Sequence, residues 1–235
     1  MSTGQPGPGA SRPLAGRRVF LSASIPDRET WRGKYDWDPL EITDAVVAGV
    51  AAIWTEGGKI LYGGHPAISP LLLRVAQDFR PEADESADGE PLVTVYQSSL
   101  YQDRIPEETL NLQAAGLGRI RFVEAVPGDT PRRGQNTASL LRMRVEMLSP
   151  QNDPAFAIFI GGMDGIEVEY RAYRERFPGR PVYPIGAPGG VARELADTVQ
   201  GSPEYVRVDP EALRESAEYG ALMDDILADA ITRIA

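Results

Sequence analysis

Residues 155–165 read AFAIFIGGMDG, an apolar run that ends in a cluster of glycines. The run Ala155–Ile160 has the composition of a central strand that is buried on both faces of a parallel sheet. Gly161 and Gly162 end this strand, and a helical pattern follows as far as Phe177. A strand, a glycine turn and a helix in this order are typical of an α/β fold.

The same alternation of short β-rich runs and helical patterns continues along the chain in both directions. Predicted strands cover residues 17–24, 59–62, 92–97, 119–124, 155–160 and 182–185. Predicted helices cover residues 38–56, 68–79, 106–115, 138–148, 164–177, 191–198 and 211–234. We therefore expect a Rossmann-like, three-layer α/β/α fold with a mostly parallel sheet.

The chain of 235 residues suits one large domain, which we expect to span residues 14–235 and to end in a helix. Residues 1–13 are rich in Gly, Pro and Ser and have no apolar segment typical of a signal peptide, so they predict a disordered lead-in. Residues 81–89 are acidic and without periodicity, which predicts a surface loop. The loop at residues 25–37 contains two tryptophans, which suit either stacking on a base or packing on a neighbouring subunit.

Composition excludes several classes of site and partner. No stretch approaches the roughly 18 apolar residues of a membrane span, so we expect no membrane contact and a cytoplasmic protein. Cysteine is absent, which excludes disulfides, thiol catalysis and cysteine-ligated metals. The net charge of −10 argues against a nucleic-acid partner. An acidic protein can still bind a small anion where arginines and helix N-termini focus positive potential in one cleft.

Three predicted strands end in glycines: Gly63-Gly64 after the second, Gly161-Gly162 after the fifth, and Gly186 with Gly189-Gly190 after the last. Ligands of open parallel sheets bind at the carboxyl ends of the strands. Glycine lets backbone N–H groups approach a phosphate, and the following helix N-terminus adds a favourable dipole. One such pair is equally well explained as a tight turn, but three at equivalent places favour a ligand site.

Arg144 lies on a helix whose apolar face is predicted to consist of Leu140, Leu141, Met143, Val145, Met147 and Leu148. On a helical wheel Arg144 falls near the middle of that face. An inward guanidinium costs several kcal/mol unless it is paired. Arg144 therefore either meets a buried carboxylate or reaches into a cleft for a phosphate or carboxylate of a ligand.

Carboxylates follow the second glycine cluster. Asp164 and Glu167 have the spacing of a capping box, and we favour that structural interpretation for Glu167. Glu169 lies beside the apolar stripe of the same helix. A carboxylate one turn into a helix that faces a phosphate pocket suits binding ribose hydroxyls or polarising a water. A solvated acid favoured by the helix dipole explains Glu169 equally well.

Further polar groups are expected at the same edge of the sheet. His65, the single histidine, follows Gly64; it cannot by itself build a multi-histidine metal site, and we favour a hydrogen bond to a ligand over catalysis. No Walker loop or Gly-x-Gly-x-x-Gly fingerprint occurs, which disfavours an ATPase or an ordinary dehydrogenase. We predict no cofactor and no metal. The expected ligand-binding residues are Ser22, Ser24, Gly63, Gly64, His65, Gln97, Ser98, Arg144, Gly161, Gly162, Met163, Asp164 and Gly165.

The chain resembles the SLOG superfamily, which includes the LOG phosphoribohydrolases and the DprA-type DNA-processing proteins. The stretch Gly161–Glu169 is similar to the LOG signature Pro-Gly-Gly-x-Gly-Thr-x-x-Glu with one inserted residue. The resemblance implies that Glu169 occupies the position of the catalytic glutamate and Arg144 that of the catalytic arginine. The proline and threonine of the signature are missing here, which puts LOG-type hydrolysis in doubt and leaves nucleotide binding intact.

The sequences of several segments resemble more closely those of another SLOG branch, the SLOG proteins of bacterial conflict systems. These segments are Phe20–Pro26, Gly63–Pro70, Tyr96–Ser98 and Phe159–Met163. Relatives there include the sensor domain of Thoeris defence effectors, which binds a cyclic ADP-ribose isomer. The resemblance implies a homodimer or larger homo-oligomer that pairs through helices near the site, with a possible effector protein encoded nearby.

Three functions follow from these observations. The first is a sensor that binds an NAD- or ADP-ribose-type nucleotide in signalling or phage defence. The second is a hydrolase of an N-glycosidic bond, in which Arg144 anchors the phosphate and Glu169 assists the attack of water. The third, weaker alternative is a structural subunit whose pocket is vestigial.

Overall fold

The computed structural model describes residues 12–79, 89–131, 137–199 and 207–234. Most of the two segments that we expected to be irregular, residues 1–13 and 81–89, lies outside the described residues.

The described strands form one sheet of six parallel strands, which confirms the predicted fold class. They are β1 (Arg18–Ser24), β2 (Lys59–Tyr62), β3 (Val93–Ser98), β4 (Gly118–Val123), β5 (Phe156–Gly161) and β6 (Val182–Ile185). The strand order is β4-β3-β2-β1-β5-β6. The chain builds outward from β1 in one direction as far as β4, and then returns to place β5 on the other side of β1. The order of the strands therefore reverses between β1 and β5.

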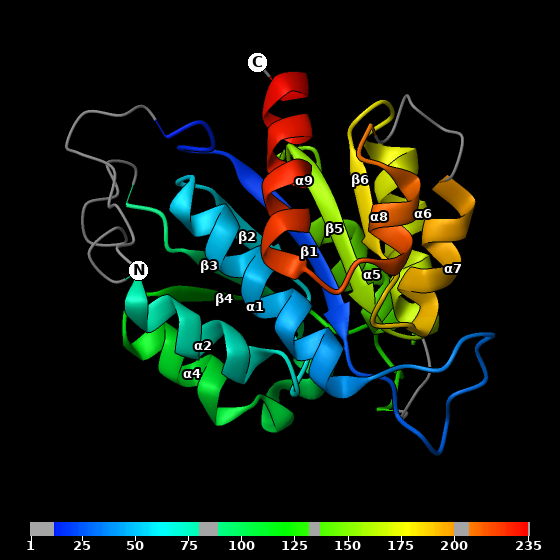
Figure 1. Ribbon diagram of the computed structural model, residues 1–235. Helices are drawn as coiled ribbons and strands as arrows, with labels where there is room; N and C mark the ends of the chain where they lie inside the picture. The colour runs from blue at the N-terminus through cyan, green and yellow to red at the C-terminus, as the bar shows by residue number, and fades with distance from the viewer. Residues whose placement is uncertain (1–11, 80–88, 132–136, 200–206, 235) are drawn as a thin grey trace.

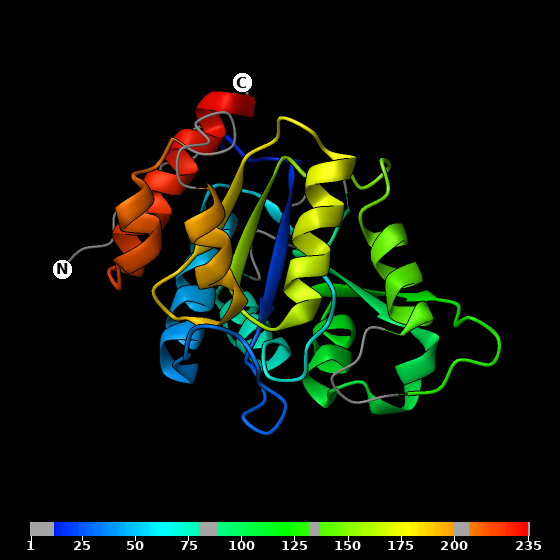
Figure 2. The same ribbon diagram turned by 90° about the vertical axis from the view of Figure 1, so that its right-hand side faces the viewer.

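Helices cover both faces of this sheet (Figures 1 and 2). On one face lie α1 (Pro39–Thr55), α2 (Ser69–Asp78), α4 (Glu107–Ala114) and α9 (Tyr219–Ile234). On the other face lie α5 (Ala138–Met147) and α6 (Asp164–Arg176). Two helices pack beside β6 at the sheet edge, α7 (Gly190–Val199) and α8 (Pro210–Glu215), and a 3₁₀ turn, η1 (Ser99–Arg104), follows β3.

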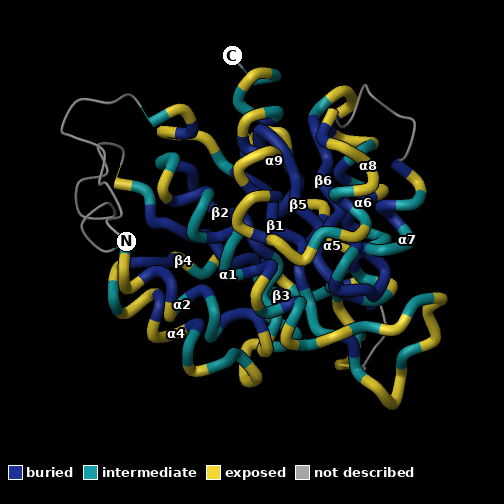
Figure 3. Tube along the Cα trace, viewed as in Figure 1, coloured by how far each residue is buried: buried dark blue, intermediate teal, exposed yellow. Residues whose placement is uncertain are grey.

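The core lies between these layers, and the central strands are its most buried part (Figure 3). Phe156, Ile158 and Ile160 on β5 are all 0% exposed, as expected of a strand with helices on both faces. The predicted start of α1 is also confirmed: the Asp38 carboxylate accepts hydrogen bonds from the Leu40 and Glu41 amides at 2.7 and 3.3 Å.

Two expectations about helices are wrong. The single helix predicted over residues 211–234 is two helices, because Ser216 is extended and its hydroxyl accepts from the Glu218 amide. This break lets α8 contact β6 while α9 packs along α1. On α5, Leu141 and Val145 are 43% and 53% exposed instead of buried, because the buried stripe is rotated toward Ser139, Met143 and Met147.

Candidate functional site

The reversal of strand order places the carboxyl ends of β1 and β5 side by side. Ser24 is in register with Gly161, and the Gly162 amide donates to the Ser24 carbonyl at 2.8 Å. The helices that follow these two strands, α1 and α6, leave toward opposite faces of the sheet (Figure 2). Open α/β sheets bind their ligands in the crevice that forms at such a switch point.

The glycine turn after β5 needs its glycines. Gly161 and Gly162 have φ values of +64° and +78°, which L side chains rarely adopt. A Cβ on Gly161 would also lie 2.7 Å from the Ser24 carbonyl oxygen. The turn therefore brings the backbone close to β1 and directs the start of α6 toward the carboxyl edge of the sheet.

Among the described residues, no side chain caps the N-terminus of α6. The cap position is Met163, so Asp164 and Gly165 are the first residues inside the helix, and their amides have no helical carbonyl to bind. The capping box expected from Asp164 and Glu167 is not formed, because the helix begins one residue earlier than that pattern requires and Asp164 lies inside it. Glu167 instead pairs with Arg171 on the helix surface. Open amides at a helix N-terminus suit an anion.

Arg144 on α5 and Glu169 on α6 bind each other. Arg144 Nε lies 2.9 Å from Glu169 Oε1, and the Ser22 hydroxyl donates to Glu169 Oε2 at 2.6 Å. The three residues are buried, with exposures of 8%, 9% and 1% for Arg144, Glu169 and Ser22. Of the two interpretations of Arg144, the structure therefore shows a buried carboxylate as its partner, and that partner is the other candidate catalytic residue. Glu169 is not a solvated acid.

The turn after β2 lies next to this pair. A Cβ on Gly63 would come 3.6 Å from Glu169 Oε1. Gly64 has a φ of +62°, and a Cβ at this residue would lie 2.6 Å from the Gln97 amide oxygen. Only glycine therefore lets Gln97 approach the turn this closely. Ser98 is different: it is fully buried and caps η1 by accepting from the Leu100 amide at 3.3 Å. Of the polar groups predicted after β3, Gln97 thus meets the Gly64 turn and Ser98 has a structural contact.

His65 follows this turn with its backbone held on both sides. Its amide donates to the Tyr62 phenol, and its carbonyl accepts from that phenol and from the Ser69 hydroxyl, each at 3.1 Å. The Ala67 amide donates to Nδ1 at 3.2 Å, so Nδ1 carries a lone pair and the neutral ring carries its proton on Nε2. Burial lowers the pKa of His65 from 6.5 to about 4. Burial likewise raises the pKa of the Tyr62 phenol.

The model of the SLOG cluster3 family matches residues 34–226. This chain belongs to the SLOG cluster3 family. The resemblance seen in the sequence is thereby confirmed at the level of the superfamily, and the matched range includes Arg144, Glu169 and the glycine turn after β5.

A solved structure shares the fold of this SLOG chain. The X-ray structure of TM1055, a structural genomics target, superposes with a TM-score of 0.50 over 89% of this chain and 99% of that chain, at 12% identity. At that identity the likeness concerns the fold alone. No curated protein matches the chain.

The third glycine cluster of the SLOG chain has a structural use that the sequence pattern did not indicate. A Cβ on Gly190 would lie 2.7 Å from the Gly161 carbonyl carbon, and the Val191 amide donates to the Gly162 carbonyl at 3.0 Å. Gly189 pairs with Trp37 of the loop after β1. These glycines allow three backbone segments to meet, and they support the turn after β5 from behind.

For the loop at residues 25–37 the sequence suggested stacking on a base or packing on a neighbouring subunit, and the structure shows which contacts the loop makes within the chain. The Thr30 hydroxyl contacts Met163 Sδ at 3.8 Å, so the loop reaches the start of α6. Trp31 packs under Gly33 of its own loop, and the Arg28 guanidinium lies 4.8 Å from the Trp37 ring centroid. Its length and aromatic content between a strand end and a capped helix were the available signals.

Neither a metal-binding cluster nor a membrane-spanning helix occurs among the described residues. They contain no cluster of three or more His, Asp or Glu side chains that could hold a metal ion. No helix among them has the length and apolar composition required to span a membrane.

The depressed pKa of His65 predicts a pH dependence of stability. Since the folded pKa of about 4 lies below the unfolded value of 6.5, the contribution is complete above pH 6.5 and is lost as the pH falls toward 4. We expect His65→Gln to flatten the fall in urea midpoint over this range relative to the wild type. Parallel pH profiles for the two proteins would contradict the assignment.

Proposed function

We propose that the protein binds a nucleotide-derived ligand of the NAD or ADP-ribose type and acts as a sensor in cytoplasmic nucleotide signalling or phage defence. The observation that carries this proposal is a buried arginine, Arg144, bound to Glu169 in α6, the helix whose uncapped N-terminus lies at the switch point of the sheet. Both features favour an anion, and a nucleotide diphosphate is the anion that such crevices bind.

The proposed binding mode assigns the diphosphate oxygens to the turn Gly161–Gly165 and to Arg144. Within the turn, the open amides of Asp164 and Gly165 are the proposed donors, because the Gly162 amide already donates to the Ser24 carbonyl. Glu169 orients the guanidinium group through its 2.9 Å bond to Arg144 Nε, and the Ser22 hydroxyl in turn holds Glu169 Oε2 at 2.6 Å. A charged side chain that is already oriented loses little entropy when it meets a phosphate. Ser24, Gly63, Gly64, His65, Gln97 and Ser98 are the remaining proposed contacts from the β1, β2 and β3 ends, although Ser98 already caps η1.

Hydrolysis of an N-glycosidic bond is the alternative, and the burial of Glu169 within the same cluster is the observation in its favour. In that reaction Arg144 anchors the phosphate, and Glu169 stabilises the positive charge that develops at the anomeric carbon. The bond to the base breaks as water adds to this carbon, and the base leaves with a proton from the water. However, both Glu169 oxygens already accept hydrogen bonds, from Arg144 and from Ser22. This arrangement supports an orienting role for Glu169 and hence binding over cleavage.

One experiment separates the two functions. The purified protein is incubated with AMP, NAD, ADP-ribose and cyclic ADP-ribose isomers, and thermal unfolding and base release are both followed. A sensor gives a raised Tm and leaves the ligand intact, because a ligand concentration of about 100 times Kd adds about 2.7 kcal/mol to the free energy of unfolding. Base release that Glu169→Gln abolishes would identify the hydrolase instead. Unchanged Tm and intact nucleotides throughout would reject both.

We also propose a homodimer or larger homo-oligomer. The exposed apolar side chains of Leu141 and Val145 lie one turn apart on α5, the helix that carries Arg144, and they support pairing through that helix. Light scattering of the purified protein tests this, and a mass of one chain would contradict it. An effector protein encoded nearby is the proposed recipient of the signal.

A further inference from the structure

A strip of the loop after β1, Lys34–Asp38, runs along one side of α7. It is fastened at the start of α7, where the Gly190 amide donates to the Asp36 carbonyl at 3.2 Å. One turn later, the Lys34 amide donates to Glu194 Oε1 at 3.0 Å. After a further turn, the Tyr35 hydroxyl donates to Asp197 Oδ2 at 2.6 Å. Positions three and four apart share a helix face, so α7 presents one continuous seat for this strip.

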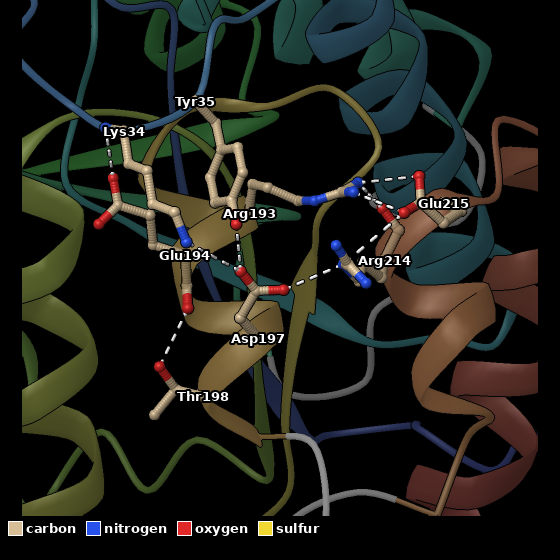
Figure 4. Close-up of polar contacts among 8 residues, drawn as sticks. All are labelled: Lys34, Tyr35, Arg193, Glu194, Asp197, Thr198, Arg214 and Glu215. Atoms are coloured by element: carbon tan, nitrogen blue, oxygen red, sulfur yellow. Dashed lines mark hydrogen bonds and ion pairs between the residues drawn. The ribbon is translucent and has the colours of Figure 1, made fainter.

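The Tyr35 side chain points toward α7, where it lies close to Arg193 and Asp197 (Figure 4). Its ring lies between two cations, with Lys34 Nζ at 4.6 Å and Arg193 Cζ at 5.6 Å from its centroid. Cations over an aromatic face are attracted by its electron density. The hydroxyl bond to Asp197 and these two contacts fix the ring on α7.

The acceptor of the Tyr35 hydroxyl is itself held from α8. Arg214 Nε lies 3.0 Å from Asp197 Oδ1, which leaves Oδ2 directed at Tyr35. Arg193 on α7 pairs with Glu215 on α8 at 2.5 Å. Figure 4 shows these side chains meeting between the two helices. We call this group, Tyr35 with Arg193, Asp197, Arg214 and Glu215, the Tyr35 clamp.

The strip connects the clamp to the glycine turn by backbone contacts alone. Asp36, next to Tyr35, accepts from the Gly190 amide, and Gly190 is packed directly against Gly161. The Val191 amide then donates to the Gly162 carbonyl. A Cβ at Gly189 would come 1.9 Å from the Asp36 carbonyl oxygen, so the two backbone segments are in direct contact there and leave no room for a side chain.

We propose that Tyr35 is a positioning residue that fixes the glycine turn Gly161–Gly165 for ligand through the Lys34–Asp38 strip. This inference rests on the proposed function for its ligand, and it adds that binding at the turn and closure of the clamp stabilise each other. Since linkage is reciprocal, a ligand that needs the ordered turn binds more weakly when the clamp is loosened.

The test compares Tyr35→Phe with Tyr183→Phe in the full chain. Tyr35→Phe removes the hydroxyl and keeps the ring between its cations. Tyr183→Phe is the matched control, because it removes a similar tyrosine–carboxylate bond, at 2.9 Å to Asp229, that joins β6 to α9 and involves no residue of the strip or of the turn. Amide NMR of the ligand-free proteins and calorimetric titration with ADP-ribose are the two measurements.

We expect Tyr35→Phe to shift the amide signals of Gly161 and Gly162 and to weaken ADP-ribose binding about threefold to tenfold, the size of one lost hydrogen bond. Tyr183→Phe is expected to change neither. An affinity of Tyr35→Phe equal to that of the wild type would overturn the coupling. If the wild type binds no ADP-ribose, the titration is repeated with NAD, AMP and the cyclic ADP-ribose isomers. If it binds none of them, the proposed function fails, and the positioning role is then decided by the ligand-free signals: unchanged Gly161 and Gly162 signals overturn it.

Discussion

Replacing Glu169 by leucine is expected to lower the free energy of unfolding by about 3–5 kcal/mol, because the Arg144 guanidinium would be left buried without its carboxylate. The Ser22 hydroxyl would lose its acceptor as well. Urea unfolding measures this effect. Glu167→Leu on the same helix is the matched control, since its pair with Arg171 is exposed and such pairs contribute about 1 kcal/mol or less.

The double variant Arg144→Met with Glu169→Leu sharpens this prediction. Removing both charges also eliminates the buried guanidinium, so the double variant is expected to be more stable than Glu169→Leu alone. It should nevertheless bind no nucleotide, because the proposed phosphate contact is gone. A cost of Glu169→Leu no greater than that of Glu167→Leu would contradict the buried pair.

Replacing Gly189 by alanine is expected to be similarly damaging, with a loss of about 3–5 kcal/mol. The residue has a φ of +84°, and its Cβ would lie 1.9 Å from the Asp36 carbonyl oxygen and 2.8 Å from the Trp37 Cα. The strain of the positive φ is therefore added to a clash with backbone that cannot rotate away. Thermal or urea unfolding of the variant measures the loss.

Gly179→Ala is the control for Gly189→Ala. Gly179 has a φ of +82°, but a Cβ there would meet nothing within 4 Å, so only the conformational cost of about 1–2 kcal/mol remains. The difference between the two variants isolates the close approach of the loop to α7. Equal losses would show that the 36–38 segment yields to the added methyl group.

Much of the fold follows from local pattern. The apolar run before Gly161 is a central strand, and all six predicted strands occur within a residue or so of their predicted bounds. A strand buried on both faces has a composition that its sequence displays directly. The continuous terminal helix was wrong because the break at Ser216 depends on packing of α8 against β6, which no periodicity reports.

The sequence identified individual residues of the candidate site, but it did not predict which of them contact one another. The helical wheel indicated that Arg144 is buried, and it is 8% exposed. Its bond to Glu169 joins two different helices, and the wheel cannot choose between a protein carboxylate and a ligand. The exposure of Leu141 and Val145 was missed for a related reason. A helical wheel shows only which side of a helix is apolar, whereas packing against the sheet decides which residues are buried, and here these residues are centred on Met143.

The contribution of the loop after β1 was also beyond the sequence pattern. Tyr35 and Asp197 are far apart along the chain and meet only because α7 starts beneath the glycine turn. Long-range contacts of this kind depend on the final packing of the elements. One sequence feature could have suggested a role for Tyr35: it is an aromatic residue among charged residues in a loop that follows β1.

Amide NMR of the wild-type protein titrated with ADP-ribose, AMP and NAD tests the central claim most directly. The glycine-rich turn provides backbone amides at the place where the phosphate is proposed to bind. We predict that one of these nucleotides shifts the amide signals of Gly161, Gly162, Met163, Asp164 and Gly165 in a saturable way, with smaller changes elsewhere. Saturable shifts confined to another part of the chain, or no shift with any of the three nucleotides, would contradict a nucleotide site at this turn.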